Sequence, residues 1–534
     1  MSARSKGLRL LLQVVLAAGA LTAPQHARST GSVSGAAEPT DPEGGQDRQT
    51  EDASAPQAGP DTTAWATFVY LKPAPVLRLR LAIEEGVLMS IATIGYLIVQ
   101  PPPSIQGIPT PIWPWQKLTF QPGSWSFDAD PWGTNLQGHV FAGTLYYAFA
   151  RGSRVSIPEA FAWTFGAALT WEIVEYNEPV SINDMIMTPV GGMAVGEALT
   201  QLSGWFDRSG NDSLRRAFAW ILDPAKKFND WMDNATPVVD PSTAGWHEFQ
   251  AFIAAGFMRQ GLEPGPSYGI VQLGVQTRLF RVPGYQTAGR GDFGFWDGNA
   301  SRITLTGTFQ GSKVVDSLFD TETAVAGKYA RDLDGSDGQL RGWDYYAAVT
   351  VGYENSGHVW DVAANSPPNR IALVRMPGIV FRPRAFLGSF ELDVGIEASL
   401  LFGAVDPLGW PQAVPPSPGV AYPPVLVQQG YYFALGLRLA PSLQVRYGVL
   451  ALGAAACVDS FRAITGGNAV PPPGQMASLS DRRDLASVWL RARFEGPPIE
   501  AGMRAEWRSR SGVINDVRVN QKEEALLGTL AVIF

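Results

Sequence analysis

Residues 499–508 read Ile-Glu-Ala-Gly-Met-Arg-Ala-Glu-Trp-Arg, and their side chains alternate in character along the chain. The apolar set is Ile499, Ala501, Met503, Ala505 and Trp507, and between them stand Glu500, Gly502, Arg504, Glu506 and Arg508. Because successive side chains of a β-strand point to opposite faces, this stretch predicts a strand with one apolar and one polar face. The stretches 390–400 and 271–279 alternate in the same way. The second half of the chain is therefore expected to be β-structure.

About twelve such segments follow one another from residue 246 to the end, each near the length that a tilted membrane-spanning strand needs. They begin near residues 247, 269, 301, 321, 342, 370, 389, 430, 442, 485, 498 and 523. We expect very short turns at 440–442 and 496–498, and longer connections after the seventh, ninth and eleventh strands. Short turns on one side and long loops on the other are typical of outer-membrane barrels. Residues 246–534 are thus predicted to form an antiparallel transmembrane β-barrel.

The last residue, Phe534, continues the apolar face of the final strand. An aromatic residue in this position resembles the signal that the outer-membrane barrel assembly machinery reads, which makes that machinery an expected partner. The alternative is a soluble β-sandwich or lipocalin-like barrel, whose strands also alternate but bury their apolar faces inside.

Composition excludes several other classes of protein. Charged residues make up only 17% of the 534 residues, the mean hydropathy is -0.01, and no long apolar run follows the N-terminus. A multi-span helical transporter is therefore not expected. The single cysteine, Cys457, rules out a disulfide framework, and the net charge of -8 argues against nucleic acid as a partner.

The first half of the chain has a different organisation. Residues 1–23 read as a secretory signal peptide, and residues 24–63 have the composition of a disordered linker. Residues 64–235 are predicted to form a helical domain. Within it we expect helical stretches at 84–99, 135–151, 157–176 and 191–206. The expected fold class is α+β multidomain, with a small N-terminal helical bundle followed by a barrel of about twelve strands.

Polar residues stand at helical spacing inside these apolar helices. The candidate catalytic residues are His139, Glu172, Glu175 and Asp184, because a histidine oriented by a carboxylate is the usual general base. The alternative is a buried polar network that fixes how the helices pack. Its expected members include Asp130, Asn135, Asn183 and Glu197.

No metal or cofactor is expected in this chain. A second histidine three or four residues from His139 is absent, which argues against helix-borne zinc or di-iron motifs. The sequence Gly289-x-Gly291-x-x-Gly294 has dinucleotide-binding spacing, but it lies between predicted strands, so we expect no nucleotide.

Four segments of the helical domain occur together in a specific order. They are Phe127-Asp128-x-Asp130-Pro131-Trp132-x-x-Asn135-x-x-x-His139, Tyr146-Tyr147-x-x-Ala150-Arg151, Trp171-Glu172-x-x-Glu175 and Ser181-x-Asn183-Asp184-x-x-x-Thr188-Pro189-x-Gly191-Gly192-x-x-x-Gly196-Glu197. Over residues 90–205 the chain resembles the bacterial domain of unknown function 3943, a family without an assigned activity. A fainter similarity is to the VanZ family of helical membrane proteins, which suggests only how the bundle is laid out.

These observations predict an outer-membrane protein of a Gram-negative bacterium, with the helical domain on the periplasmic side. The leading hypothesis is a non-enzymatic role in the cell envelope or in lipid handling, with outer-membrane lipids as partners. A second hypothesis is a lipid- or cell-wall-modifying hydrolase or transferase that uses His139 and the nearby carboxylates. A third is a diffusion channel with the helical domain as its plug.

Overall fold

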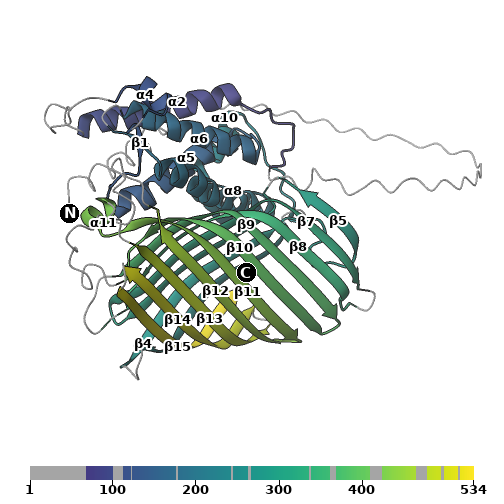
Figure 1. Ribbon diagram of the computed structural model, residues 1–534. Helices are drawn as coiled ribbons and strands as arrows, with labels where there is room; N and C mark the ends of the chain where they lie inside the picture. The colour runs from purple at the N-terminus through teal and green to yellow at the C-terminus, as the bar shows by residue number, and fades with distance from the viewer. Residues whose placement is uncertain are drawn as a thin grey trace, which may run out of the picture.

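The structure is a computed structural model, and it places a helical domain beside a β-barrel (Figure 1). It describes residues 68–533 except 100–111, 122, 176–177, 242–244, 262–265, 297, 336–337, 361, 363–367, 409–423, 465–477, 495–497 and 515–516. The expected signal peptide, the expected linker up to residue 63 and the terminal Phe534 lie outside the described residues.

The helical domain contains the four helices that the sequence predicts, with somewhat different ends. Its elements are α2 (Arg78–Val99), α4 (Pro114–Leu118), β1 (Trp125–Ser126), η2 (Gly133–Gly138), α5 (His139–Gly152), α6 (Ile157–Val174), β2 (Val180–Ser181), α7 (Asp184–Ile186), η3 (Met187–Gly191), α8 (Gly192–Ser209), α9 (Ser213–Leu222) and α10 (Pro224–Met232). The segments η2 and η3 are π-helical turns, and β1 and β2 form a short parallel pair. Among the described residues, no helix has both the length and the hydropathy needed to cross a membrane.

Two glycines allow α5 and α8 to pack in direct backbone contact. A Cβ atom on Gly143 would lie 1.9 Å from the carbonyl oxygen of Thr188, and one on Gly192 would lie 2.3 Å from the carbonyl carbon of Gly143. Any side chain at either position would push the two helices apart. The close crossing brings the N-terminal ends of both helices together, and the polar residues of the candidate site stand there.

The barrel is a closed antiparallel ring with twelve strand positions. Its strands are β3 (Trp246–Gln260), β4 (Ser267–Phe280), β5 (Gly289–Phe295), β6 (Ala300–Gln310), β7 (Lys313–Asp334), β8 (Arg341–His358), β9 (Asn369–Leu387), β10 (Phe390–Val405), β11 (Tyr432–Tyr447), β12 (Leu450–Ala463), β13 (Leu479–Phe494), β14 (Ile499–Ile514) and β15 (Val517–Ile533). The ring closes through the pairing of β3 with β15 and of β7 with β8. The short β5 pairs with the same edge of β7 as β6 does, so β5 and β6 together fill one position. A short helix, α11 (Pro424–Gln429), precedes β11.

The strand count is confirmed, but one predicted turn is wrong. Residues 440–442 lie inside β11, and the reversal comes at Gly448, whose φ of 55° suits a tight turn. Pro441 is tolerated within the sheet because pairing between β11 and β12 is interrupted beside it. The connection from β14 to β15 is also shorter than predicted, since only residues 515 and 516 separate the two strands.

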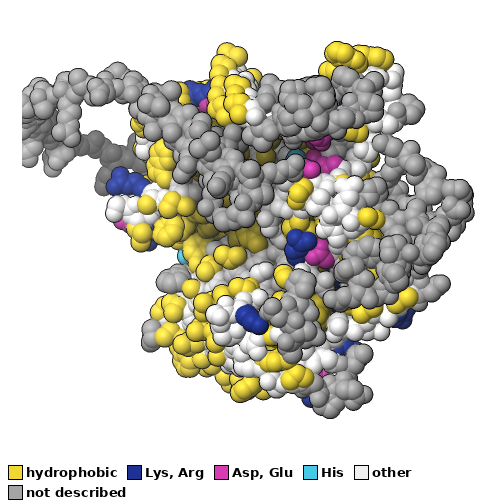
Figure 2. Space-filling model, turned by 90° about the vertical axis from the view of Figure 1, so that its left-hand side faces the viewer, with side chains coloured by type: hydrophobic (Ala, Val, Ile, Leu, Met, Phe, Trp, Pro, Cys, Tyr) yellow, Lys and Arg dark blue, Asp and Glu magenta, His cyan; other side chains and the backbone are white. Residues whose placement is uncertain are grey.

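The barrel exposes its apolar face and turns its charges inward, so the soluble-sandwich alternative is wrong. Figure 2 shows hydrophobic side chains spread over the lower flank of the barrel, with few charged side chains among them. The exposed large apolar side chains come from most strands of the ring and include Ile253, Phe257, Leu273, Leu305, Ile379, Leu400, Leu437, Leu452, Leu490, Met503, Leu526 and Leu530. We call this set the apolar belt. Such a belt is what a membrane-spanning barrel presents to lipid.

The helical domain packs against the outer wall of the barrel, over the strands from β7 to β11 (Figure 1). On β8, Thr350 and Glu354 line the lumen, whereas Val351 and Tyr353, which stand between them in the chain, lie on the opposite, outward face. Val351 and Tyr353 are buried in one apolar core with residues of α5 and α8. Helices α2 to α10 contribute no residue to the lining of the lumen cavity, so the described helical domain does not plug it. At one end of the barrel, Leu426 of α11 is buried with Leu401 and Leu479. The periplasmic placement of the domain stays a prediction.

Candidate functional site

A buried polar cluster lies where the π-helical turns η2 and η3 lead into α5 and α8. Asp128 is at its centre, because its Oδ1 atom accepts hydrogen bonds from the side-chain amides of Asn135 and Asn183. The side-chain oxygen of Asn183 in turn accepts a hydrogen bond of 3.1 Å from the main-chain N–H of Asp128. A π-helical turn re-aims side chains within a helix and is frequent at functional sites. The predicted residues Asn135 and Asn183 therefore share a site.

His139 lies between a carboxyl group and a hydroxyl group. Its Nε2 atom is 3.3 Å from Oδ2 of Asp184, and its Nδ1 atom is 3.3 Å from the hydroxyl of Thr188. Burial lowers the pKa of His139 to about 4 and raises the pKa of Asp184 well above its usual range. Burial thus favours the neutral imidazole of His139 and the neutral carboxyl of Asp184 over an ion pair between them.

Glu172 joins the cluster from α6, and Glu175 follows at the C-terminal end of that helix. Oε2 of Glu172 accepts a hydrogen bond of 2.6 Å from the main-chain N–H of Ser181, whose hydroxyl accepts one of 3.2 Å from the N–H of Asp184. Burial raises the pKa of Glu172 to about 8. At the end of α6, the ammonium group of Lys117 donates to the main-chain carbonyl of Glu175 over 2.7 Å, and burial raises the pKa of the Glu175 carboxyl to about 9.

The barrel also contributes to the cluster, through a residue at the start of β11. The hydroxyl of Tyr431 donates a hydrogen bond of 2.7 Å to the main-chain carbonyl of Asp130 and accepts one of 3.0 Å from the amide of Asn135. The predicted residue Asp130 therefore takes part through its backbone. Tyr431 is fully buried, so the cluster is sealed on this side by the barrel.

Glu197 belongs to a second, separate cluster. Its Oε2 atom accepts hydrogen bonds of 2.8 Å from Nε of Arg151 and 2.9 Å from the hydroxyl of Tyr147, and Gln201 donates to its Oε1 over 3.2 Å. All four side chains are buried. The arrangement pairs the charges of Arg151 and Glu197 inside the bundle, and it holds α5 to α8.

The cluster around His139 has the geometry of a fixed polar network more than that of a general base. A base with a pKa far below 7 is a weak proton acceptor at neutral pH. Among the described residues, no group of three or more His, Cys, Asp or Glu side chains is arranged to hold a metal ion. Buried polar networks of this kind fix the register of packed helices.

Sequence reasoning missed three residues of this site as site residues: Asp128, Thr188 and Tyr431. The first two stand in the quoted motifs, seven residues before Asn135 and four after Asp184, and this spacing beside known polar positions was an available signal. Tyr431 is 296 residues from Asn135. The role of Tyr431 depends on how the helical domain packs on the barrel. No local pattern in the sequence indicates that packing.

A separate groove runs between α2 and α6 on the helical domain. It encloses about 470 Å³ and is lined by small and apolar side chains together with two carboxylates: Ala82, Glu85, Gly86, Met89, Glu159, Ala162, Trp163, Gly166, Ala167 and Thr170. Glu159 at its rim pairs with Arg78 over 2.6 Å. Glu85 is only 6% exposed, and its Oε1 atom has no hydrogen-bond partner. Burial raises the pKa of Glu85 to about 8, so this carboxyl is mostly protonated at neutral pH.

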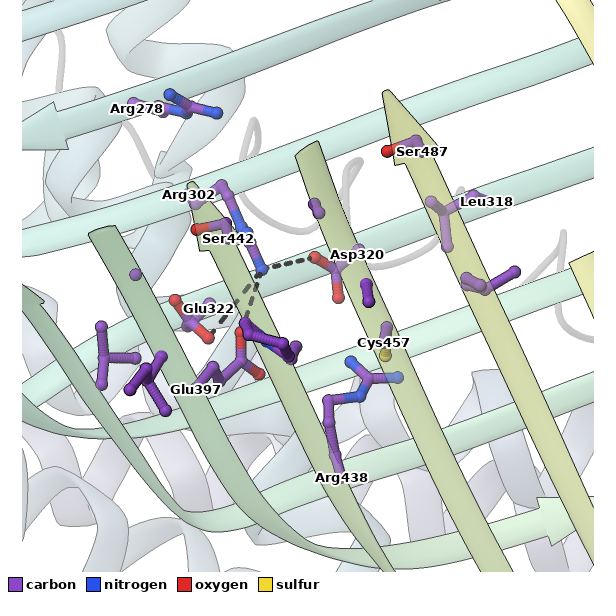
Figure 3. Close-up of a pocket in the computed structure, with 18 of the residues that line it drawn as sticks. Arg278, Arg302, Leu318, Asp320, Glu322, Glu397, Arg438, Ser442, Cys457 and Ser487 are labelled. Atoms are coloured by element: carbon purple, nitrogen blue, oxygen red, sulfur yellow. Dashed lines mark hydrogen bonds and ion pairs between the residues drawn. The ribbon is translucent and has the colours of Figure 1, made fainter. Parts of the chain in front are cut away.

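Ion pairs cross the lumen of the barrel, which contains a cavity of about 610 Å³. Arg302 of β6 lies 3.2 Å from Asp320, 3.8 Å from Glu322 and 4.0 Å from Glu397 of β10 (Figure 3). Glu354 of β8 pairs with Arg438 of β11 over 2.7 Å and with Arg483 of β13 over 2.6 Å. Asp320 and Glu322 belong to β7, the neighbour of β6, but β6 and β10 are not neighbours in the ring, and β8 is not a neighbour of β11 or β13. The pairs of Glu397 and Glu354 therefore connect separate parts of the wall through the lumen.

The fold and these sites define an outer-membrane-type β-barrel protein with a helical domain attached to its outer wall. Residues 124–225 match the family model described as Domain of unknown function (DUF3943), which confirms the similarity in the helical domain. No curated protein matches the chain. The similarity to VanZ proteins stays a hypothesis.

Solved structures similar to this chain are barrels, and each similarity is remote. The β domain of the Bordetella autotransporter BrkA is 12% identical, with 53% of this chain and 98% of that chain covered and a TM-score of 0.21. OmpT of Vibrio cholerae is 9% identical, with 54% and 97% covered and a TM-score of 0.20. The TodX monoaromatic hydrocarbon channel is 7% identical, with 55% and 91% covered and a TM-score of 0.21. The strand pairing described above, and not these similarities, defines the barrel.

Proposed function

We propose that this protein resides in the outer membrane of a Gram-negative bacterium and that its helical domain binds an envelope lipid without modifying it. The observation that carries the proposal is the groove between α2 and α6, which is largely apolar and holds the unpartnered carboxyl of Glu85. A binding site for a lipid needs apolar walls for the acyl chain and a few polar groups that orient the headgroup. A protonated Glu85 can donate a hydrogen bond to a phosphate or ester oxygen.

The outer-membrane location is tested first, by fractionation and by gel mobility. The mature protein from outer membranes is run boiled and unboiled in mild detergent. A folded barrel in that fraction changes its mobility on boiling. Recovery as a soluble periplasmic protein with no mobility change would contradict the location.

Lipid binding is tested by filling the groove. Cβ atoms at Gly86 and Gly166 would meet nothing within 4 Å, so Gly86→Leu and Gly166→Leu fill the groove without a backbone clash. Purified protein is washed in detergent, and its retained phospholipid is measured by mass spectrometry. We expect both variants to lose most of the lipid that the unmodified protein retains.

The matched control is Gly269→Leu on β4, where an added Cβ also meets nothing within 4 Å. This variant should retain lipid as the unmodified protein does. Equal lipid content in the groove variants and the control would argue against a binding role for the groove.

A second candidate function is a lipid- or cell-wall-modifying hydrolase or transferase. Its support is the position of His139, 3.3 Å from both Asp184 and the Thr188 hydroxyl. Purified protein is incubated with outer-membrane lipid or with peptidoglycan, and the products are followed by mass spectrometry. The enzyme hypothesis expects a product that disappears in His139→Ala and Glu172→Ala while both variants still fold. Absence of product with the unmodified protein would rule it out for these substrates.

A further inference from the structure

The part of the barrel wall that the helices cover is continuous with the apolar belt. On β11, Phe433 is 2% exposed beneath the helical domain, while Leu435 and Leu437 on the same face are 56% and 61% exposed. On β10, Phe402 is buried and Leu400, two residues before it on the same face, is 50% exposed. The helical domain therefore begins where the exposed belt side chains of β10 and β11 end, and the covered and exposed side chains follow one another on the same outward face of each strand.

The side of the helical domain turned away from the barrel is apolar as well. The exposed large side chains of α2 are Leu79, Ile83, Val87, Ile94 and Ile98, which follow one another at helical spacing along one stripe. The exposed residues Leu214, Phe218 and Ile221 form a second apolar stripe on α9, which lies beside the barrel, since Phe218 stacks on Phe206 and Phe206 on Phe249 of β3. Figure 2 shows hydrophobic side chains at the top of the helical domain, in addition to those on the barrel.

Many charged side chains of the helical domain are paired within it. Lys226 is buried between Asp207 at 2.8 Å and Asp230 at 2.7 Å. Arg154 is buried against Asp230 and Asp233. A domain that faced water on its outer side would be expected to place charges there and to avoid a large apolar patch.

We propose that the helical domain lies within the membrane, beside the barrel, with the outer stripe of α2 in contact with lipid acyl chains. This inference rests on the outer-membrane location proposed above, and it replaces the periplasmic placement that the sequence suggested. The inner side of the domain contacts the barrel wall and its outer side contacts lipid. No single helix therefore needs to span the bilayer. Lipid then has direct lateral access to the groove between α2 and α6.

The test measures the environment of single spin labels in reconstituted protein. Cys457 is replaced by Ala, and one cysteine at a time is introduced at Ile83 or Ile94 on α2. Leu437→Cys in the apolar belt is the lipid control, and Lys313→Cys at the exposed turn before β7 is the water control. Each protein is labelled and reconstituted into phosphatidylcholine vesicles. Collision with oxygen, which is concentrated in lipid, is compared with collision with a water-soluble nickel complex.

We expect both α2 sites to have an oxygen-to-nickel ratio within about twofold of the Leu437 site and well above that of the Lys313 site. The inference is overturned when the α2 sites behave like Lys313 while Leu437 still behaves as lipid-exposed. When Leu437 is water-exposed too, the outer-membrane location itself fails. Boiled and unboiled gel mobility is measured for each variant, so that a misfolded protein is recognised and replaced by a neighbouring site, Val87→Cys.

Discussion

The hydroxyl of Tyr353, on the outer wall of β8, donates a hydrogen bond of 2.6 Å to the main-chain carbonyl of Leu136 in the helical domain. Both residues are buried. Tyr353→Phe keeps the ring but removes this buried hydrogen bond, which contributes about 0.5–1.5 kcal/mol. We expect a lower thermal unfolding midpoint in detergent for this variant. Tyr447→Phe, at a position 69% exposed, is the control and should leave the midpoint unchanged.

The crossing of α5 and α8 predicts a contrast between two glycine substitutions. Gly143→Ala places a methyl group against the carbonyl of Thr188, and overpacking of this kind costs about 1–3 kcal/mol or more. Gly166→Ala meets nothing within 4 Å and adds helix propensity of about 0.5–1 kcal/mol. Thermal unfolding of both variants checks the prediction. Equal destabilisation would show that the helices do not cross at Gly143.

Two carboxylates paired with arginine differ in burial, and this predicts different costs of removing them. Glu197 is fully buried with Arg151, so Glu197→Ala leaves an uncompensated buried charge and costs about 3–5 kcal/mol. Glu159 pairs with the largely exposed Arg78, and Glu159→Ala should cost no more than about 1 kcal/mol. The folded yield and the urea unfolding of both variants, Glu197→Ala and Glu159→Ala, measure these costs. A small effect of Glu197→Ala would mean that the pair does not form.

Because of Glu172, the folded protein is expected to lose stability as the pH rises. Its pKa is raised from 4.5 to about 8 in the folded protein, so between these values the folded state holds a proton that the unfolded state releases. Stability from this group is therefore complete below pH 4.5 and is lost as the pH rises towards 8, by at most about 1.4 kcal/mol per pH unit.

Glu172→Gln imitates the protonated carboxyl and can still accept the hydrogen bond from Ser181. We expect this variant to be more stable than the unmodified protein at pH 8 and equally stable at pH 5, as measured by urea unfolding. Glu159→Gln is the control, because Arg78 lowers the pKa of this carboxyl, and the stability of this variant should vary with pH between 5 and 8 as that of the unmodified protein does. If the stability of Glu172→Gln changed with pH in the same way as that of the unmodified protein, the raised pKa of Glu172 would be contradicted.

The ion pairs across the lumen predict a low conductance. Glu354 pairs with Arg438 and Arg483 from across the cavity, and these contacts narrow the path for ions. In planar bilayers the unmodified protein should conduct weakly, and Glu354→Ala should conduct more. Glu391→Ala, whose partner Arg446 is 3.9 Å away near the β9–β10 turn, should change conductance less. A large open conductance of the unmodified protein would favour the channel hypothesis instead.

Local patterns in the sequence were sufficient for the elements of the fold. Alternation with period two predicted the barrel strands, because one face of each strand contacts lipid and the other contacts the lumen. The helices around His139 and Glu172 were predicted for the same kind of reason. The turn at 440–442 was misplaced because Pro441 is a frequent turn residue, and only the interrupted pairing of β11 with β12 makes room for it in a strand.

The candidate site was predicted in part. His139, Asp184, Asn135, Asn183 and Glu172 do meet, because η2 and α5, the C-terminal part of α6 and the short α7 come together near the crossing of α5 and α8. Glu197 was assigned to the same network but lies with Arg151, since spacing along one helix does not tell which neighbouring helix a side chain faces.

The sequence by itself determined the two kinds of secondary structure and the boundary between them. These follow from periodicity, which every short stretch carries independently. Only the tertiary structure decided that the helical domain packs on the outer wall of the barrel, that Tyr431 seals the polar cluster and that the lumen is crossed by ion pairs. Each of these features depends on contacts between residues that are far apart in the chain. Such contacts produce no periodic pattern in the sequence.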